Sequence, residues 1–351
     1  MVKLRRALGL FEATFYGIGI ILGAGIYALI GPATALAGNA VWLAFVIGAL
    51  VATFTGLSYA ELSAMYPKAA AEFVYVRKAY HSKFWAFLIG WLIIFTGVVS
   101  AATVALGFGG YFTVLFGVPQ TISALALIAL LSLVNYSGIK ESSRLNILFT
   151  GITITGLILI IFLGAGSLGK ANYFDMPSGL SGVMAAAALI FFAYLGFEDV
   201  VNISEETKSP RKLIPLALII SIAVTTTVYI LTSLSVVSIA DWKEIGSSNA
   251  PLAYVASKSF IGDAAFPVMS LIALFATGST VLVLIGVTAR MVYGMAREST
   301  LPKIFSRLDR KRKTPWIAIA AVMIFSLAFV FVGDIRTIAE ITSLGALITF
   351  F

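Results

Sequence analysis

Residues 17–27 read GIGIILGAGIY, and four of these eleven residues are glycine. The stretch lies inside an apolar run, residues 11–36, which is long enough to cross a bilayer. Each glycine weakens a helix by about 0.8–1 kcal/mol relative to alanine, and unsatisfied backbone groups are most costly in hydrocarbon. We therefore expect residues 23–25 to divide this run into two half-helices. The alternative is that the glycines allow close packing between helices.

The composition is that of an integral membrane protein. The chain is 60% hydrophobic and 11% charged, and its mean hydropathy is +1.01, whereas a soluble domain has roughly 45–50% apolar and about 25% charged residues. It contains no cysteine and one histidine, His81. Disulfides, thiolate metal sites and histidine-rich metal centres are therefore excluded. We predict no metal and no cofactor other than a coupling ion.

The apolar runs predict one transmembrane domain, residues 1–351, with ten spans. These are 11–36, 41–65, 84–115, 120–137, 146–167, 181–203, 215–239, 264–294, 315–333 and 338 onward. The last run is too short to cross before Phe351, so we expect the sequence to be truncated inside its tenth helix.

The basic residues predict the orientation of these spans. With the N-terminus in the cytoplasm, all but four of the 24 Lys and Arg residues fall in cytoplasmic segments. The exceptions are Lys170, Lys243, Lys258 and Arg336. This asymmetry predicts a multi-pass protein of the cell membrane with a cytoplasmic N-terminus. It also explains the net charge of +8 without a nucleic-acid partner. Contact of the basic run 310–313 with anionic lipid is the less favoured explanation of that run.

A second interruption lies in the span 181–203, where Gly196 is followed by Glu198 and Asp199. The two interrupted spans each open a half of five spans, and an odd number of spans inverts the second half. Interrupted spans in corresponding positions mark the binding site of secondary transporters. We therefore expect an all-α, five-plus-five inverted-repeat fold, with repeats at roughly 11–167 and 181–351. Freed amides and carbonyls at the breaks would suit a zwitterion.

Four segments carry a resemblance to a known family. They are GAGIY (23–27), SYAELSAMYPKAAAEFVY (58–75), FFAYLGFEDVVNISEETKSPRKLIP (191–215) and ARMVYGMARESTLPKIF (289–305). In these segments the chain resembles the amino acid–polyamine–organocation (APC) superfamily of amino-acid permeases, and most of all its prokaryotic members similar to cationic amino acid transporters. The resemblance implies an amino-acid substrate and a lipid bilayer as surroundings, and leaves the oligomeric state undetermined.

The resemblance also implies a set of substrate contacts at the breaks and in the third span. They are Ile21, Gly23, Ala24, Gly25, Ile26, Phe192, Ala193, Leu195, Thr96 and Val98. The amides of residues 24–26 would bind the α-carboxylate, and carbonyls near residues 21 and 192–195 would bind the α-ammonium. Because the side-chain contacts carry no acid, we expect neutral amino acids.

Coupling has two candidate sites. Glu198, an ionisable residue within a span, is the candidate proton carrier, although it could also serve structure alone, and we expect Asp199 to face elsewhere. The resemblance implies a third position, since some proton-coupled relatives place a lysine ammonium, in the role of a sodium ion, where Thr153 stands here. A sodium site could instead form from carbonyls of the first span and the hydroxyls of Thr277, Ser279 and Thr280. Hydroxyls on helices more often make helix contacts.

We therefore predict a secondary active transporter that moves amino acids by alternating access, with proton symport favoured. The alternatives are a sodium-coupled or exchange-type transporter of amino acids or polyamines, a channel, or a membrane enzyme acting on lipids. An enzyme would need clustered acids at one interface, whereas the acids here are dispersed.

Overall fold

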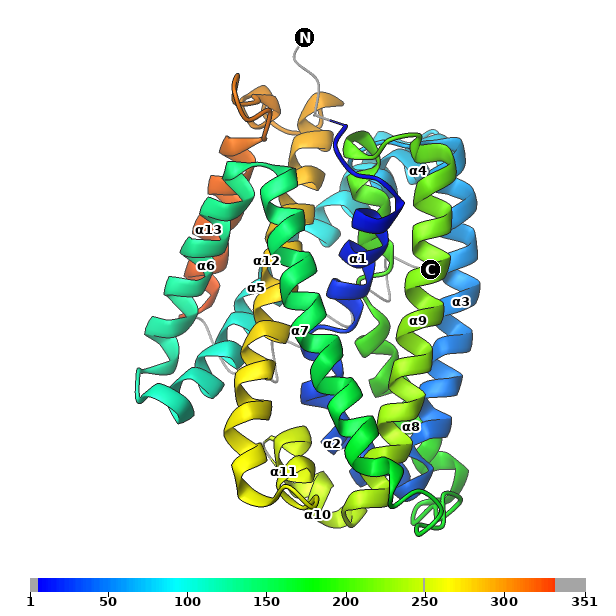
Figure 1. Ribbon diagram of the computed structural model, residues 1–351. Coiled ribbons are helices and arrows are strands. Elements are labelled where there is room, and N and C mark those ends of the chain that lie inside the picture. The colour runs from blue at the N-terminus through cyan, green and yellow to red at the C-terminus, as the bar shows by residue number, and fades with distance from the viewer. Residues whose placement is uncertain (1–5, 249, 332–351) are drawn as a thin grey trace.

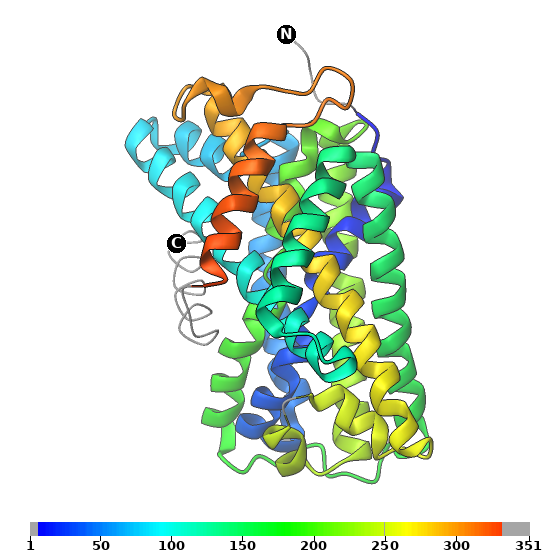
Figure 2. The ribbon, with the colours of Figure 1, turned by 90° about the vertical axis from the view of Figure 1, so that its left-hand side faces the viewer.

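The computed structural model describes residues 6–248 and 250–331, and helices dominate this part of the chain (Figures 1 and 2). The long helices are α1 (Leu10–Ile21), α2 (Ala24–Ala37), α3 (Val41–Met65), α5 (Lys83–Phe116), α6 (Gln120–Ser137), α7 (Ile139–Ala165), α8 (Gly179–Tyr194), α9 (Pro210–Ile239), α12 (Ala265–Arg297) and α13 (Trp316–Phe329). The shorter ones are η1 (Gly38–Ala40), α4 (Ala71–Tyr80), η2 (Glu198–Glu206), α10 (Trp242–Ser247), α11 (Pro251–Ser257), η3 (Gly262–Ala264) and η4 (Lys303–Ser306).

The predicted spans correspond to these helices, although α7 and α9 begin seven and five residues before the spans predicted from residues 146 and 215. Seven described segments are long and apolar enough to cross a membrane, and Gly179–Phe191 and Trp316–Phe329 are shorter apolar helices. The spans predicted at 41–65 and 120–137 coincide with α3 and α6. The span predicted from residue 338 lies outside the described residues. Large apolar side chains such as Phe54 and Phe162 are exposed on the outside of the bundle, as lipid contact requires.

The bundle has two distinct ends (Figure 1). We call one the N-terminal face, which is formed by residues 6–9, α4 and the segment 298–315. The opposite end, the distal face, is formed by residues 166–178, α10 and α11. The short helices α4, α10 and α11 were not among the predicted spans because they are too short to cross a membrane.

Helix α12 occupies the interior of the bundle. In its most apolar stretch of 18 residues 78% of the residues are buried, compared with 33% in the corresponding stretch of α5. The buried side chains form two clusters, one around α1, α2, α3, α8 and α9 and the other around α5, α6, α12 and α13. The first broken helix, α1–α2, belongs to one cluster and α5 to the other. A binding site formed by both clusters would therefore lie between the broken helix and α5.

The first interruption lies at Leu22 and Gly23, just before most of the predicted residues 23–25, because Ala24 and Gly25 already belong to α2. Helix α1 continues unbroken through Gly17 and Gly19. A Cβ on Gly17 would lie 2.6 Å from the hydroxyl oxygen of Ser221 in α9. A Cβ on Gly19 would lie 2.3 Å from the hydroxyl oxygen of Thr150 in α7. These two glycines therefore permit close packing, the alternative explanation, rather than a break.

Gly23 and Gly25 combine both roles. A Cβ on Gly23 would lie 1.6 Å from Oγ1 of Thr280, and one on Gly25 would lie 3.0 Å from Cα of Ala193. The break therefore exists where α12 and α8 approach the backbone of the first span, and no side chain fits between them.

The second interruption also falls where it was predicted. Helix α8 ends at Tyr194, and Gly196 has a φ of +114°, a conformation that side chains disfavour. The chain continues as the nine-residue 3₁₀ helix η2, an uncommon length for this type of helix. The segment following the break thus directs Glu198 and Asp199 towards the interior of the bundle.

Candidate functional site

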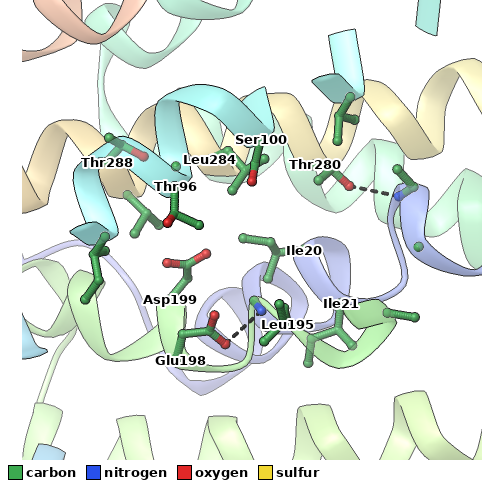
Figure 3. Close-up of a pocket in the computed structure, with 18 of the residues that line it drawn as sticks. Ile20, Ile21, Thr96, Ser100, Leu195, Glu198, Asp199, Thr280, Leu284 and Thr288 are labelled. Carbon is green, nitrogen blue, oxygen red and sulfur yellow. Dashed lines mark hydrogen bonds between the residues drawn. The ribbon is translucent and has the colours of Figure 1, made fainter. Parts of the chain in front are cut away.

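A cavity of about 120 Å³ lies between the two helix breaks on one side and helices α5 and α12 on the other (Figure 3). One wall comes from the two breaks and includes Ile20, Ile21, Leu195, Glu198 and Asp199. The opposite wall comes from α5 and α12 and includes Thr96, Ser100, Thr280, Leu284 and Thr288. The cavity therefore joins segments that are far apart in sequence, at the place predicted from the paired interruptions.

The amides predicted to bind a carboxylate are at the start of α2. Ala24, Gly25 and Ile26 are its first three residues, whose N–H groups have no partner within the helix. Ala24 and Gly25 line the cavity, whereas Ile26 is buried in the core beside it. The Ala24 N–H donates a hydrogen bond to Oγ1 of Thr280 at 3.1 Å (Figure 3). Thr280 thus holds the position that an anionic ligand would compete for.

The carbonyls at the two breaks share one partner that sequence reasoning missed. The hydroxyl of Tyr229 in α9 lies 2.5 Å from the carbonyl oxygen of Ile21 and 3.0 Å from that of Ala193. Ile21, Ala193 and Leu195, three of the predicted substrate contacts, line the cavity. The side chain of Phe192 lies outside the described part of the structure. In the sequence, Tyr229 differs from its apolar neighbours only by a hydroxyl. That difference does not predict a contact with both helix breaks.

Two acids after the second break line the cavity. Glu198 accepts a hydrogen bond from the N–H of Gly196 at 2.8 Å, which caps the broken backbone (Figure 3). The carboxylate of Asp199 points into the cavity towards α5. The expectation that Asp199 faces elsewhere is therefore wrong, because the 3₁₀ geometry of η2 presents both neighbours to the same space.

A third acid, Glu72, reaches the cavity from α4 and was not predicted. It is 3% exposed. Its carboxylate accepts hydrogen bonds from Nδ2 of Asn202 in η2, at 3.1 and 3.3 Å. Burial raises the pKa of Glu72 to about 7. A loop position near the end of a span gave no sign that this glutamate would be enclosed.

Of the two α5 residues predicted as contacts, only Thr96 lines the cavity. Val98 is buried against α12 and α13, and its carbonyl accepts a hydrogen bond from Oγ of Ser326 at 3.2 Å. Two residues along a helix turn the side chain to the opposite face. Ser100, one turn beyond Thr96, lines the cavity instead.

The hydroxyls considered for a sodium site are dispersed. Thr277 bonds to the carbonyls of its own helix, Ala273 at 2.8 Å and Leu274 at 3.1 Å. Ser279 lies 3.3 Å from the carbonyl oxygen of Gly19, and Thr280 is bonded to the Ala24 amide. Only Ser279 therefore contacts a carbonyl of the first span.

Thr153 is likewise separate from these groups. Its hydroxyl bonds to the carbonyl of Phe149, and its own carbonyl accepts from the hydroxyl of Tyr27. The α7 residue beside Ser279 is Asn146, whose Oδ1 lies 2.8 Å from the Ser279 hydroxyl. The side-chain amide of Asn146 also donates to the carbonyl of Phe15. This link of α7 to α1 and α12 lies two helical turns before Thr153.

An ion pair enclosed near the N-terminal face was also missed. Nε and Nη2 of Arg290 in α12 donate to the two carboxylate oxygens of Glu206, and these side chains are 3% and 1% exposed. The carbonyl of Glu206 also accepts from the amides of Ala7 and Leu8. The pair therefore links α12 and η2 to the segment that precedes α1.

The fold defines the class of protein. The crystal structure of MhsT in complex with L-phenylalanine matches 99% of this chain and 89% of its own, with a TM-score of 0.70 at 15% identity. The protein therefore has the inverted-repeat transporter fold with interrupted first and sixth spans, as predicted.

The family follows from the sequence comparisons. The family described as Amino acid permease matches residues 8–351, and the chain belongs to it. Relatives include the branched-chain amino acid permease BcaP (29% identical) and the methylthioribose transporter (30%) of Bacillus subtilis, each matching 99% of this chain and 79% of its own length. Human cationic amino acid transporter 4 is 29% identical, over 99% of this chain and 58% of its own. The predicted APC membership is confirmed, and the protein is a multi-pass membrane transporter rather than an enzyme.

Proposed function

We propose that the protein is a secondary active transporter that carries amino acids across the cell membrane by alternating access, with its N-terminal face in the cytoplasm. The observation that carries this proposal is the cavity that touches both helix breaks. The cavity is lined by Ala24 and Gly25 at the start of α2, where the Ala24 amide is bonded to Thr280, and by the acids Glu198 and Asp199 after the second break. Backbone of this kind is tolerated at membrane depth where it lines a cavity.

The cavity suggests how an amino acid binds. The α-carboxylate would accept hydrogen bonds from the amides of Ala24 and Gly25 once Thr280 releases the first of them. The α-ammonium would lie near the carbonyls of Ile21 and Ala193, which also line the cavity. Tyr229 holds both carbonyls in place.

The side-chain pocket favours a neutral, apolar amino acid. Apolar residues from α1, α5, α12 and the second break line the cavity: Ile20, Ile93, Val104, Leu284 and Leu195. Burial of apolar surface against them would contribute about 25 cal/mol per Å². The name of one relative, a branched-chain amino acid permease, supports the same substrate class.

Proton coupling is the favoured driving force. Glu198 and Asp199 adjoin the substrate position, and none of the described lining residues is Lys or Arg. A proton on either carboxylate would cancel one negative charge of the cavity, and its release on the other side would restore that charge. Glu198 is the leading carrier because it is bonded to the break itself.

A cationic amino acid or polyamine is the second candidate substrate. Glu72, Glu198 and Asp199 give the cavity three acids, and a positively charged side chain would neutralise them directly. A relative named as a cationic amino acid transporter is consistent with this alternative.

Uptake into proteoliposomes tests the proposal. Labelled leucine, lysine and glutamate would be offered under a proton gradient, a sodium gradient, or neither. Leucine accumulation driven by external acid supports the proposal, and lysine accumulation supports the cationic alternative. Sodium-driven uptake would move coupling to the oxygens around Ser279 and Thr280, and uptake that needs only internal amino acid would indicate exchange. No saturable uptake of any amino acid by folded protein would overturn the substrate class.

A further inference from the structure

A second cavity, of about 210 Å³, lies on the N-terminal face at the corner between α6 and α7. Its lining includes four basic residues, Lys140, Lys311, Arg312 and Lys313, and two acidic ones, Glu141 and Glu206. The carboxylate of Glu206 is already paired with Arg290. The remaining charge of the cavity is therefore positive, which suits an anion.

The loop that carries three of these cations is held in a defined shape. One carboxylate oxygen of Asp309 accepts hydrogen bonds from the backbone amides of Lys311 and Arg312, at 2.8 and 2.7 Å. The hydrogen bonds from these two amides lower the pKa of Asp309 and keep its carboxylate charged, and the bond from Arg312 has the larger effect. Lys313 has a φ of +57°, which is unusual for a residue with a side chain. The basic side chains thus project from a formed turn.

This loop is also attached to the end of α6. The hydroxyl of Thr314 donates to the carbonyl of Tyr136 at 3.0 Å. The guanidinium of Arg312 lies 4.2 Å from the centre of the Tyr136 ring. The 27-residue helix α7 begins at Ile139 in the cavity wall, and the positive end of its dipole adds to the basic charge.

The cavity adjoins a lipid-exposed stripe of α6. Leu130 and Leu133 are 59% and 62% exposed. They lie on the same helical face as Ser137, which lines the cavity. On the neighbouring helix α13, Trp316 is also exposed, two residues after Thr314. An apolar track therefore leads along the helix to the basic cavity.

We propose that this cavity binds the phosphate headgroup of an anionic phospholipid, whose acyl chains lie along α6. A soluble anion would use the same basic charges, but it would gain nothing from the apolar track. Glu206 lines the cavity, so a bound lipid would lie beside the Glu206–Arg290 ion pair that links η2 to α12. Occupancy should therefore stabilise the folded protein.

The test measures lipid binding and thermal stability, so it does not depend on the transported substrate. The purified full chain in nanodiscs of phosphatidylcholine would receive increasing fractions of phosphatidylglycerol, with lipid retention measured by native mass spectrometry. The variant with Lys311→Gln, Arg312→Gln and Lys313→Gln should bind phosphatidylglycerol about fivefold more weakly for each charge removed. Its gain in melting temperature on adding phosphatidylglycerol should also disappear.

Three comparisons make the result decisive. Lys68→Gln, Lys78→Gln and Lys83→Gln remove the same charge from exposed positions of the same face, and this matched variant should bind like the wild type. Lys140→Gln alone should weaken binding about fivefold and guards against misfolding of the triple variant. Equal loss in both triple variants would overturn the proposal. Displacement of the lipid by millimolar inorganic phosphate would overturn its assignment to phospholipid.

Discussion

Gly25 in α2 packs directly on Ala193 in α8: a methyl group at Gly25 would lie 3.0 Å from both Cα and Cβ of Ala193. The breaks of the first and sixth spans are therefore in contact, and the cavity forms beside that contact. Any side chain at Gly25 would push the two interrupted helices apart, since Ala193 presents backbone that cannot rotate away.

Gly25→Val should abolish or strongly reduce substrate binding. Its Cβ would already overlap Ala193, and overpacking costs about 1–3 kcal/mol, so we expect affinity to fall about 5- to 150-fold. Equilibrium binding of labelled leucine to purified protein measures this. Gly151→Val in α7 is the control, because a Cβ at Gly151 meets nothing within 4 Å. Unchanged affinity in Gly25→Val would mean that the substrate binds elsewhere.

Tyr229→Phe should destabilise the protein by about 1–3 kcal/mol, because buried carbonyls at the breaks would lose their donor. Substrate affinity should fall as well, since the proposed binding pose places the α-ammonium near the same carbonyls. Thermal unfolding in detergent and the KM of uptake measure the two effects. Tyr173→Phe, which removes a hydroxyl bonded to Ser238 far from the breaks, should leave KM unchanged. The same KM in both variants would contradict the role of Tyr229.

Glu198→Gln separates the proton from the cap. Glutamine keeps an oxygen that can accept a hydrogen bond from the Gly196 N–H, but its amide does not take up a proton as a carboxylate does. We expect acid-driven accumulation to be lost while exchange of internal for external substrate persists. Counterflow and gradient-driven uptake would be measured on the same vesicles. If only Asp199→Asn abolished accumulation, the coupling role would pass to Asp199.

Glu206→Gln should be strongly destabilising, because it leaves the buried Arg290 without its carboxylate. Breaking a buried pair in this way costs about 3–5 kcal/mol. The exposed pair of Arg77 and Glu298, at 36% and 43% exposure, provides the control. Glu298→Gln should cost no more than about 1 kcal/mol. Melting temperatures of the two variants compare the pairs, and equal values would show that burial of Arg290 is not decisive.

Stability should fall as the pH rises because of Glu72. Burial raises the pKa of Glu72 to about 7, whereas an unfolded glutamate titrates near 4.3. The folded protein therefore holds more protons between these values, so this contribution is fully present below about pH 4.3 and is lost as the pH passes through about 7. The loss amounts to about 4 kcal/mol. Wild type should lose stability relative to Glu72→Gln between about pH 4 and pH 7. Parallel melting curves across that range would refute the assignment.

The sequence predicted the two breaks because their signals are local. A glycine pair in a long apolar run and acids after a glycine both show in a short window, and their positions agree with Gly23 and Gly196 in the structure. The role of the other glycines was not local. Gly17 and Gly19 face Ser221 and Thr150, and only the packed helices show that these positions must be small.

The residues that line the cavity were predicted in part for the same reason. Residues at a break are adjacent in sequence, so Ala24, Gly25 and Leu195 could be named together. Choosing Thr96 but not Val98 on α5 required the rotation of that helix about its axis. Choosing Asp199 required the 3₁₀ geometry of η2, which no sequence period indicated.

By itself, the sequence determined the class of protein, the course of the spans and the location of the breaks, since hydrocarbon imposes long apolar runs and restricts breaks to special residues. The tertiary structure alone decided which polar groups meet inside. Tyr229 reaches Ile21 across 208 residues, and Thr280 reaches Ala24 across 256. Such contacts depend on the packing and rotation of whole helices, which local sequence patterns do not specify.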